Sequence, residues 1–221
     1  MATSGTTTFD LDLMELLDEA YEQAGRVFRS GHDYESARRS LNLVFQEWAN
    51  KGVNLWTLDQ GSISLVAGQA TYSLPANTVD LLDIFLTVDD RDYQLTRIGH
   101  SSYASINDKT KQARPQQVFV ERHKAPHLTL WPIPEKAYTL KYWRLRRIQD
   151  AGQAQNTLDL PTRFLPALAA ALAVQLARKN PQIDVQRLTI LSEIAERAMR
   201  EAQGEDRDRS SFYLRVSRRR I

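Results

Sequence analysis

The sequence predicts an α+β fold: a four-helix body made from helix pairs at both ends of the chain, an inserted, mainly antiparallel β-module and an extended C-terminal tail. Apolar residues recur at three- and four-residue steps near both ends, as they do in amphipathic helices. Between the ends they alternate with polar residues, as in half-buried strands. The expected divisions are a helical hairpin at 1–52, the β-module at 53–150, a second helix pair at 151–203 and the tail at 204–221.

Two helices are expected before Gly52. The first, over about 10–28, has an apolar stripe made of Met14, Leu17, Tyr21, Ala24 and Phe28. The second is expected to start from Asp33 as its N-cap, and its stripe is made of Tyr34, Ala37, Leu41, Val44, Phe45 and Trp48. Gly52 suits the left-handed position that ends a helix. Because the connecting loop is short, the two helices are expected to form an antiparallel hairpin.

The segment from Ile63 to Arg147 predicts about six or seven strands. Its alternating apolar residues include Ile63, Leu65, Tyr72, Leu74, Leu82, Ile84, Leu86 and Val88. The stretch TVDDRDYQL indicates a hairpin with an acidic turn. Three further strands are indicated by QVFVER, HLTLWP and YTLKYWRLR. The polar segment between Gly99 and Pro115 is expected to be a long loop with one helical turn at 101–107.

Two more helices are expected after a linker at 149–161. The first carries a leucine at 165, 168, 172 and 176, and Pro166 falls in its first turn, where the missing N–H costs little. It ends at Asn180-Pro181. Asp184 is expected to cap the last helix, which is expected to end at Gly204.

The composition excludes several classes of function. The chain has no cysteine, which excludes disulfides, thiolate zinc sites and cysteine nucleophiles. No stretch approaches the roughly 20 unbroken apolar residues of a membrane span, and we expect neither a secretory signal nor contact with a membrane. The formal net charge is only +2, far from the basicity of a dedicated nucleic-acid binder. Neither a P-loop nor a nucleophile elbow is present.

The histidines and aspartates do not predict a metal site. His123 and His127 are four residues apart on strand-like sequence broken by Pro126, so we expect them not to converge. The densest acidic group of the β-module consists of Asp80, Asp83, Asp89, Asp90 and Asp92. The last three lie at a hairpin tip, where turn chemistry favours aspartate. We therefore expect no metal, no cofactor and no enzymatic activity. A hydrolase that uses His123 or His127 with Asp83 is the weakest alternative.

Positive charge is concentrated in two runs, whereas the first helix is acidic. The run KYWRLRR places cations beside aromatic residues, as nucleic-acid-binding surfaces do, and its candidates for a channel or subunit interface are Lys141, Arg144, Arg146 and Arg147. The alternative is a strand with one apolar face and one solvated basic face. The C-terminal tail mixes arginines with apolar residues, which favours a segment that inserts into a groove with acidic neighbours. The alternatives are a solubilising tail or a tail that packs on its own domain.

Four short motifs together resemble a known family. They are a helix end at 48–52 (Trp-x-x-x-Gly), Leu55-Trp56, a strand end at 72–75 (Tyr-x-Leu-Pro) and a turn at 131–134 (Trp-Pro-x-Pro). In their order and spacing they resemble the head-to-tail adaptor proteins of short-tailed bacteriophages, which are also called tail tubular A, gatekeeper or head-completion proteins. The resemblance covers roughly 41–147, and the last two helices match in order and length. The loop at 99–115 is not matched.

The resemblance implies a structural virion connector in the neck and tail, assembled in the host cytoplasm. Such adaptors form a ring, typically of twelve copies, under the portal; the ring extends the DNA channel, contacts the genome transiently and docks the tail nozzle or fibres. It also implies that the tail meets the portal protein, and the candidate residues are Phe212, Tyr213, Leu214, Arg215, Val216, Arg218, Arg219 and Arg220. The main alternative is a DNA-binding protein that uses the basic strand and the arginine-rich tail.

Overall fold

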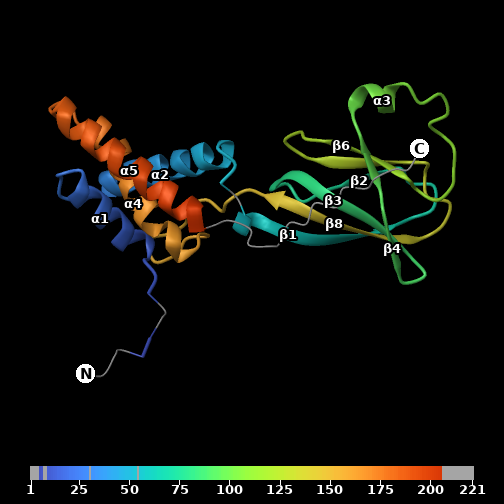
Figure 1. The fold of residues 1–221 in the computed structure, drawn as a ribbon, viewed down its shortest axis with the longest axis horizontal. Coiled ribbons are helices and arrows are strands. Elements are labelled where there is room, and N and C mark those ends of the chain that lie inside the picture. Colours follow the sequence, from blue (N-terminus) through green and yellow to red (C-terminus); the bar gives the residue numbers. More distant parts are fainter. Residues whose placement is uncertain (1–4, 7–8, 30, 54, 206–221) are drawn as a thin grey trace, which may run out of the picture. The chain divides into compact units, whose positions relative to one another are not determined.

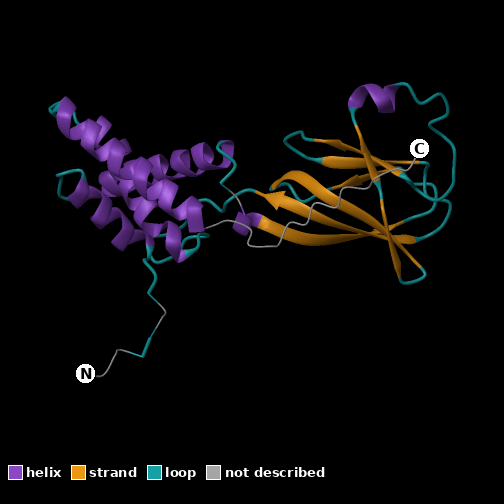
Figure 2. Ribbon diagram, in the orientation of Figure 1, coloured by secondary structure: helices purple, strands orange, loops and turns teal. Residues whose placement is uncertain are grey.

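The computed structural model describes residues 5–6, 9–29, 31–53 and 55–205 (Figure 1). They form helices and mainly antiparallel sheets (Figure 2), so the expected α+β class is confirmed. The described residues divide into two compact units: residues up to 47 together with those from 150 onward, and residues 48–149. The first unit holds α1, most of α2, α4 and α5, and the second holds all the described strands.

Helix α1 (Leu13–Gln23) is shorter than the apolar stripe predicts. It begins at a capping box. The Asp12 carboxylate accepts a hydrogen bond from the amide of Glu15 at 2.8 Å, and the Glu15 carboxylate accepts one from the amide of Asp12 at 3.2 Å. It ends early because the amide of Arg26 turns back to the carbonyl of Tyr21. Phe28, which was expected inside the helix, lies beyond it and packs edge-on against the Tyr21 ring.

Helix α2 (Gly31–Asn50) starts before the expected cap. Asp33 lies in its first turn, where the carboxylate accepts the amide of Arg29 at 3.2 Å, so the prediction of an N-cap at Asp33 is wrong. The prediction for its end is confirmed. Gly52 adopts a φ of 75°, and the amide of Val53 donates a hydrogen bond to the carbonyl of Trp48. These two features define a Schellman motif at the helix end.

Helix α4 (Leu165–Arg178) is preceded by a 3₁₀ turn at Thr162–Phe164 and has Pro166 in its first turn, as predicted. Ten of its fourteen residues are buried, so most of its surface packs against the rest of its unit. Helix α5 (Val185–Glu205) is capped by Asp184, whose carboxylate accepts the amide of Gln186. Gly204 does not end it, because the helix continues to Glu205.

Hydrogen bonds join the early and late parts of the helical unit. The amides of Leu13 and Met14 donate to the carbonyls of Asn156 and Ala154, both at 3.2 Å. Lys179, just after α4, donates to the carbonyl and hydroxyl oxygens of Ser36 in α2. Burial, and after it the nearby arginines Arg39 and Arg26, lower the pKa of Lys179. Segments more than a hundred residues apart in sequence are therefore parts of one folding unit.

The β unit contains two four-stranded sheets. One has the order β1-β8-β3-β4 and the other β2-β7-β6-β5; every pair is antiparallel except β5 with β6. The strands are β1 (Leu58–Leu65), β2 (Thr71–Ser73), β3 (Thr78–Val88), β4 (Arg91–Gln94), β5 (Thr96–Ile98), β6 (Gln117–Glu121), β7 (His127–Trp131) and β8 (Tyr138–Arg146). The alternation of apolar and polar residues in the sequence does not predict the three-residue strand β5. Buried side chains from both sheets form one apolar core.

A bulge in β3 changes which residues face the core. The register against β8 shifts between Leu81 and Ile84, so the two-residue alternation is interrupted there. Leu81 is fully buried, whereas Leu82 is 50% exposed. The prediction that Leu82 shares a face with Ile84 is therefore wrong, because the extra residue reverses the side on which the preceding residues point.

The β3–β4 hairpin and the following loop agree with the sequence. Asp89 and Asp90 form its two-residue turn with φ values of 48° and 59°, the type I′ geometry that matches strand twist. In the loop, helix α3 (His100–Ala104) supplies the expected helical turn, slightly earlier than predicted. Tyr103 from this helix stacks on Phe119 of β6 with ring centroids 5.0 Å apart.

The family motifs have local structural roles in the β unit. The Tyr72 hydroxyl accepts the amide of Val66 at 2.9 Å and lies 3.1 Å from the Gln69 carbonyl, so it closes the turn between β1 and β2. The indole nitrogen of Trp131 donates to the carbonyl of Asp108 at 2.8 Å and so holds the loop that precedes β6. Both contacts fix irregular backbone beside the sheets.

We predict that Gly61→Ala destabilises the β unit. Gly61 faces Tyr142 directly across the β1–β8 pair, and a Cβ atom at Gly61 would lie 2.5 Å from the Tyr142 ring. Since Tyr142 is buried, the ring has little freedom to move. We expect a loss of about 1–3 kcal/mol in the free energy of unfolding, measured by urea denaturation.

Two variants control this prediction. Ser62→Ala, at the exposed neighbouring position, should change stability by less than about 0.5 kcal/mol. Adding Tyr142→Leu to Gly61→Ala should cost less than the sum of the single changes, because the smaller side chain relieves the clash. Unchanged stability of Gly61→Ala would contradict the close approach.

Candidate interaction surfaces

The basic side chains of β8 are bound within their own unit. Because side chains alternate between the two faces of a strand, Arg144 and Arg146 lie on the same face as the buried Tyr142, at the end of the core-facing side. Lys141 lies on the opposite side of the strand. The interpretation of one apolar and one solvated basic face is therefore wrong: apolar and basic residues follow each other along the same face. Their roles at a channel or subunit interface stay a prediction.

Asp59 is the shared partner of the two arginines. It lies directly opposite Arg144 in the β1–β8 register, and its Oδ2 atom is 3.2 Å from a guanidinium nitrogen of each arginine. Arg144 also donates to the side chains of Asn77 and Thr78, at 2.8 and 3.1 Å. Both arginine side chains are only 14% exposed. The arginines of this cluster therefore present little of their charge at the surface, whereas Asp59 is 38% exposed.

Lys141 and its neighbours are more accessible. The Lys141 ammonium lies 3.1 Å from the carboxylate of Asp92 on β4. The pKa of Asp92 is lowered by a hydrogen bond from the Thr87 hydroxyl and, after it, by the hydrogen bond from Lys141. Trp143 is 42% exposed, and Arg147, after the end of β8, is exposed. Of the four predicted basic residues, only Arg147 has no carboxylate partner in the described part of the chain.

The histidines behave differently from the prediction. His127 lies directly opposite Glu121 in the β6–β7 pair, and its Nε2 atom contacts the Glu121 carboxylate. His123, in the turn between these strands, has its Nε2 atom 3.8 Å from the same carboxylate, and the two imidazole rings are 5.9 Å apart. They converge because the chain reverses direction in the hairpin between them. The prediction considered only the i, i+4 spacing of a helix and therefore missed this contact.

Asp80 and Asp83 bind side chains of their own unit. Asp80 binds Arg97 at 2.7 Å and Arg122 at 3.3 Å, and Asp83 accepts a long hydrogen bond from Gln94. In the described ranges, no three His, Asp or Glu side chains are grouped so that they could hold a metal ion. Likewise, no described helix has the length and apolar character needed to cross a membrane.

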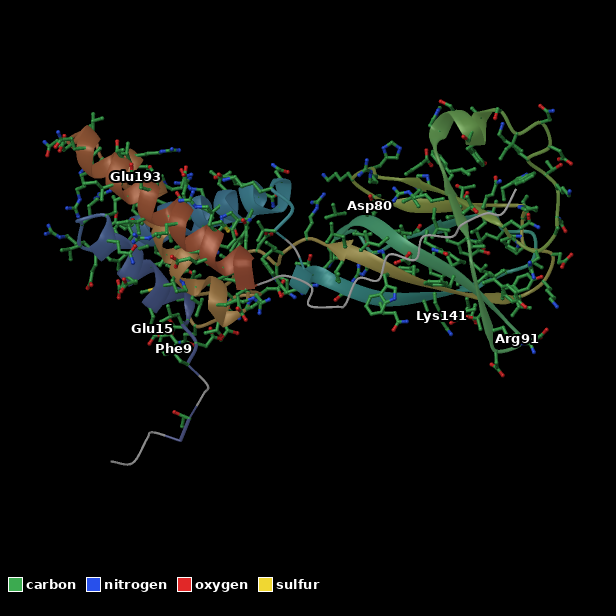
Figure 3. All side chains as sticks on the ribbon, viewed as in Figure 1. Phe9, Glu15, Asp80, Arg91, Lys141 and Glu193 are labelled. Carbon is green, nitrogen blue, oxygen red and sulfur yellow. The ribbon has the colours of Figure 1, made fainter. Side chains whose placement is uncertain are left out.

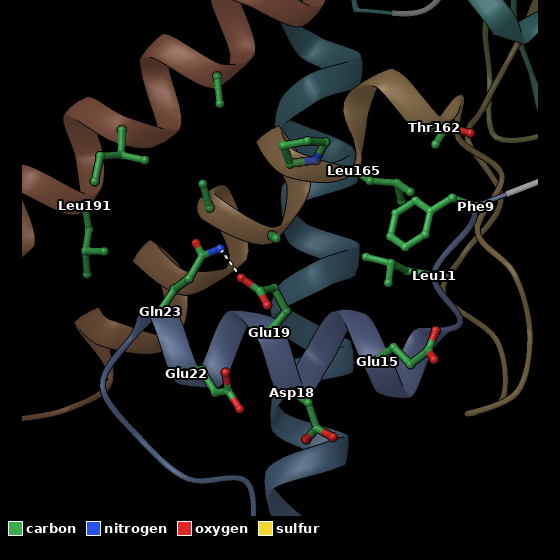
Figure 4. A pocket seen from close by; sticks show the side chains of 15 residues that line it. Phe9, Leu11, Glu15, Asp18, Glu19, Glu22, Gln23, Thr162, Leu165 and Leu191 are labelled. Atoms are coloured by element: carbon green, nitrogen blue, oxygen red, sulfur yellow. Dashed lines mark hydrogen bonds between the residues drawn. The ribbon is translucent and has the colours of Figure 1, made fainter. Parts of the chain in front are cut away.

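The helical unit contains a groove that the sequence does not predict (Figure 4). It has a volume of about 1020 Å³ and lies among α1, α4 and α5. Its apolar floor comes from α4, α5 and the segment before α1; the residues are Phe9, Leu11, Leu165, Pro166, Ala169, Ala170, Leu191, Ile194 and Ala198. None of the fifteen described residues that line it is basic. A hollow made by helices from both ends of the chain has no local sequence signal.

One wall of the groove is acidic. Glu15, Asp18, Glu19 and Glu22 follow the i, i+3, i+4, i+7 spacing of a single helix face, and Figure 4 shows them along α1. The Glu15 carboxylate serves the capping box, and Glu19 accepts a hydrogen bond from Gln23 at 2.7 Å. Asp18 and Glu22 have no ion pair with the part of the chain that the structure describes. We call this stripe the acidic wall.

The candidate residues for the portal interface, Phe212 to Arg220, lie outside the described residues.

We predict that Asp59→Asn destabilises the β unit by about 2 kcal/mol, because it leaves two largely buried guanidinium groups without their carboxylate. Asp92→Asn is the matched control: it breaks an ion pair whose side chains are 39% and 45% exposed and should have the smaller effect. Urea denaturation measures both variants. Equal losses for the two would contradict a structural role for the Asp59 cluster.

Comparison with protein families identifies the chain. A family model described as SU10 adaptor protein matches residues 5–219, nearly the whole sequence. The comparison with curated proteins finds no significant match. The match extends the motif resemblance at 41–147 to both helical ends and confirms it. The chain therefore belongs to the SU10 adaptor protein family, a family of phage head-tail adaptors.

Proposed function

We propose that the chain is a structural head-to-tail connector whose copies form a closed ring under the portal, extend the DNA channel and dock the tail. The observation that carries this proposal is the family match over residues 5–219. A phage structural adaptor belongs to the virion and interacts with other head and tail proteins. The proposal adds the ring, the portal as the partner above it, nozzle or fibre proteins below it and assembly in the host cytoplasm.

The two units support a ring assembly. A closed ring of identical copies is heterologous, so each subunit needs two unlike surfaces that meet head to tail. The helical unit presents the acidic wall, and the β unit presents a mixed outer surface that includes Trp143 and Lys141. We propose that helix pairs from both chain ends act as one four-helix body, with the β-module at 53–150 as its insert. Twelve copies is the number that the adaptor resemblance implies.

The electrostatics of β8 favour a channel protein over a tight DNA binder. Affinity for duplex DNA depends on the number of phosphates that free cations neutralise. Arg144 and Arg146 are committed to Asp59, and Lys141 is paired with Asp92. Little free positive charge of β8 itself therefore remains for the genome, which suits DNA that has to slide during packaging and ejection. We propose only transient contact between DNA and this surface.

We predict that the C-terminal tail is required for attachment to the portal. The tail carries the proposed apolar and arginine contacts, from Phe212 to Arg220. The full-length chain should co-sediment with its portal ring, and a chain that ends at Glu205 should lose most of this binding. The shorter chain keeps every described helix and strand, so circular dichroism and urea denaturation control for its folding.

Each other outcome has a definite meaning. Equal loading of the two chains would keep the connector but remove the tail as its portal contact. If neither chain sediments with the portal, and the full-length chain binds duplex DNA tightly at physiological salt, the DNA-binding function replaces the connector.

A further inference from the structure

We propose that, in the free subunit, the groove beside α1 binds the chain's own C-terminal segment, residues 209–221. The inference concerns the subunit before assembly and does not require the portal interaction. Before assembly, the groove would hold the same segment that contacts the portal in the proposed function. The portal and the groove would then compete for the same residues.

The groove has the chemistry to bind an amphipathic basic segment. Its floor is apolar, and Phe9 and Ile194 on its lining keep 71% and 39% of their surface exposed. Asp18 and Glu22 on the acidic wall are without an ion-pair partner among the described residues. A bound segment would cover apolar surface and supply cations to these carboxylates in one step.

The C-terminal segment is the complement of this groove. Residues 209–221 contain five arginines and no aspartate or glutamate. Among the arginines stand Phe212, Tyr213, Leu214 and Val216. Apolar side chains fit the floor, and arginines reach carboxylates on the wall through charge-assisted hydrogen bonds. An acidic or purely polar segment would lack one of the two interactions.

The segment can reach the groove of its own subunit. It follows α5, and α5 itself lines the groove through Leu191, Ile194 and Ala198. Ala198 lies seven residues before the end of the helix at Glu205, about 10 Å along the axis. The six residues at 206–211 span up to roughly 20 Å when extended, so the chain can turn back and deliver Phe212. Such a short tether gives an effective concentration of the order of millimolar, which favours the subunit's own segment over that of a second copy.

The absence of cysteine gives a direct test in the full-length chain. Asp18→Cys places a thiol on the acidic wall, and Ser217→Cys places one in the segment. In a dilute solution under mild oxidation, the double variant should form an intramolecular disulfide. The control pairs Ser217→Cys with Glu193→Cys, which removes the same charge from an exposed site of α5 outside this groove (Figure 3).

The groove pair should oxidise at least about tenfold faster than the control pair. Glu193 lies twelve residues before the end of α5, about 18 Å along the helix, which an unbound tail can also reach. Adding Glu22→Gln and Phe212→Ser should remove the advantage of the groove pair, because these changes delete one wall charge and one apolar contact. About 1 M salt should reduce it as well, since it shortens the Debye length to roughly 3 Å.

Two results would overturn the inference. Equal oxidation rates for the two pairs would show that the segment does not prefer the groove. Disulfide-linked dimers that form in place of the intramolecular product would assign the groove to the tail of a second copy. Because the portal is absent from the experiment, either failure leaves the proposed portal contact untouched, and loss of portal binding leaves this inference untouched.

Discussion

The burial of α4 is the constraint on which the helical unit depends. Ten of its fourteen residues are buried, so the helix has to be enclosed by others. α1 comes from the start of the chain and α5 from its end, and both contact α4. Main-chain hydrogen bonds from Leu13 and Met14 to the 154–156 segment hold the same arrangement. The helices that precede and follow residues 48–149 in the sequence therefore pack into one compact unit.

Much of this fold is predictable because it follows from local patterns. The helices and most of the strands follow from apolar periodicity, and the helix ends at Gly52 and Asp184 follow from backbone and capping chemistry. Two of the errors have non-local causes. A bulge turns Leu82 outward, and a hairpin brings His123 and His127 together. The two-residue alternation along a strand predicts that Arg144 points to the same side as Tyr142. Its partner Asp59 is not predictable in this way, because it lies on a strand far away in sequence.

The distribution of charge connects the two units to assembly. In the β unit, each basic residue of β8 is paired with Asp59 or Asp92, and Asp59 is shared by two arginines. In the helical unit, the acidic wall keeps two carboxylates without an ion pair to any described residue. The carboxylates beside the apolar floor are exposed and accessible to a basic partner, whereas Arg144 and Arg146 already bind Asp59. Of these two charged clusters, the acidic wall is the more accessible one. The sequence could not show this groove, since its walls come from opposite ends of the chain.

Electron cryomicroscopy of the full-length chain bound to its portal tests the central claim most directly. The connector account predicts a closed ring coaxial with the portal channel, in which unlike surfaces of neighbouring subunits meet around the axis. Chains bound singly at the portal periphery, or paired through one self-complementary surface, would contradict it.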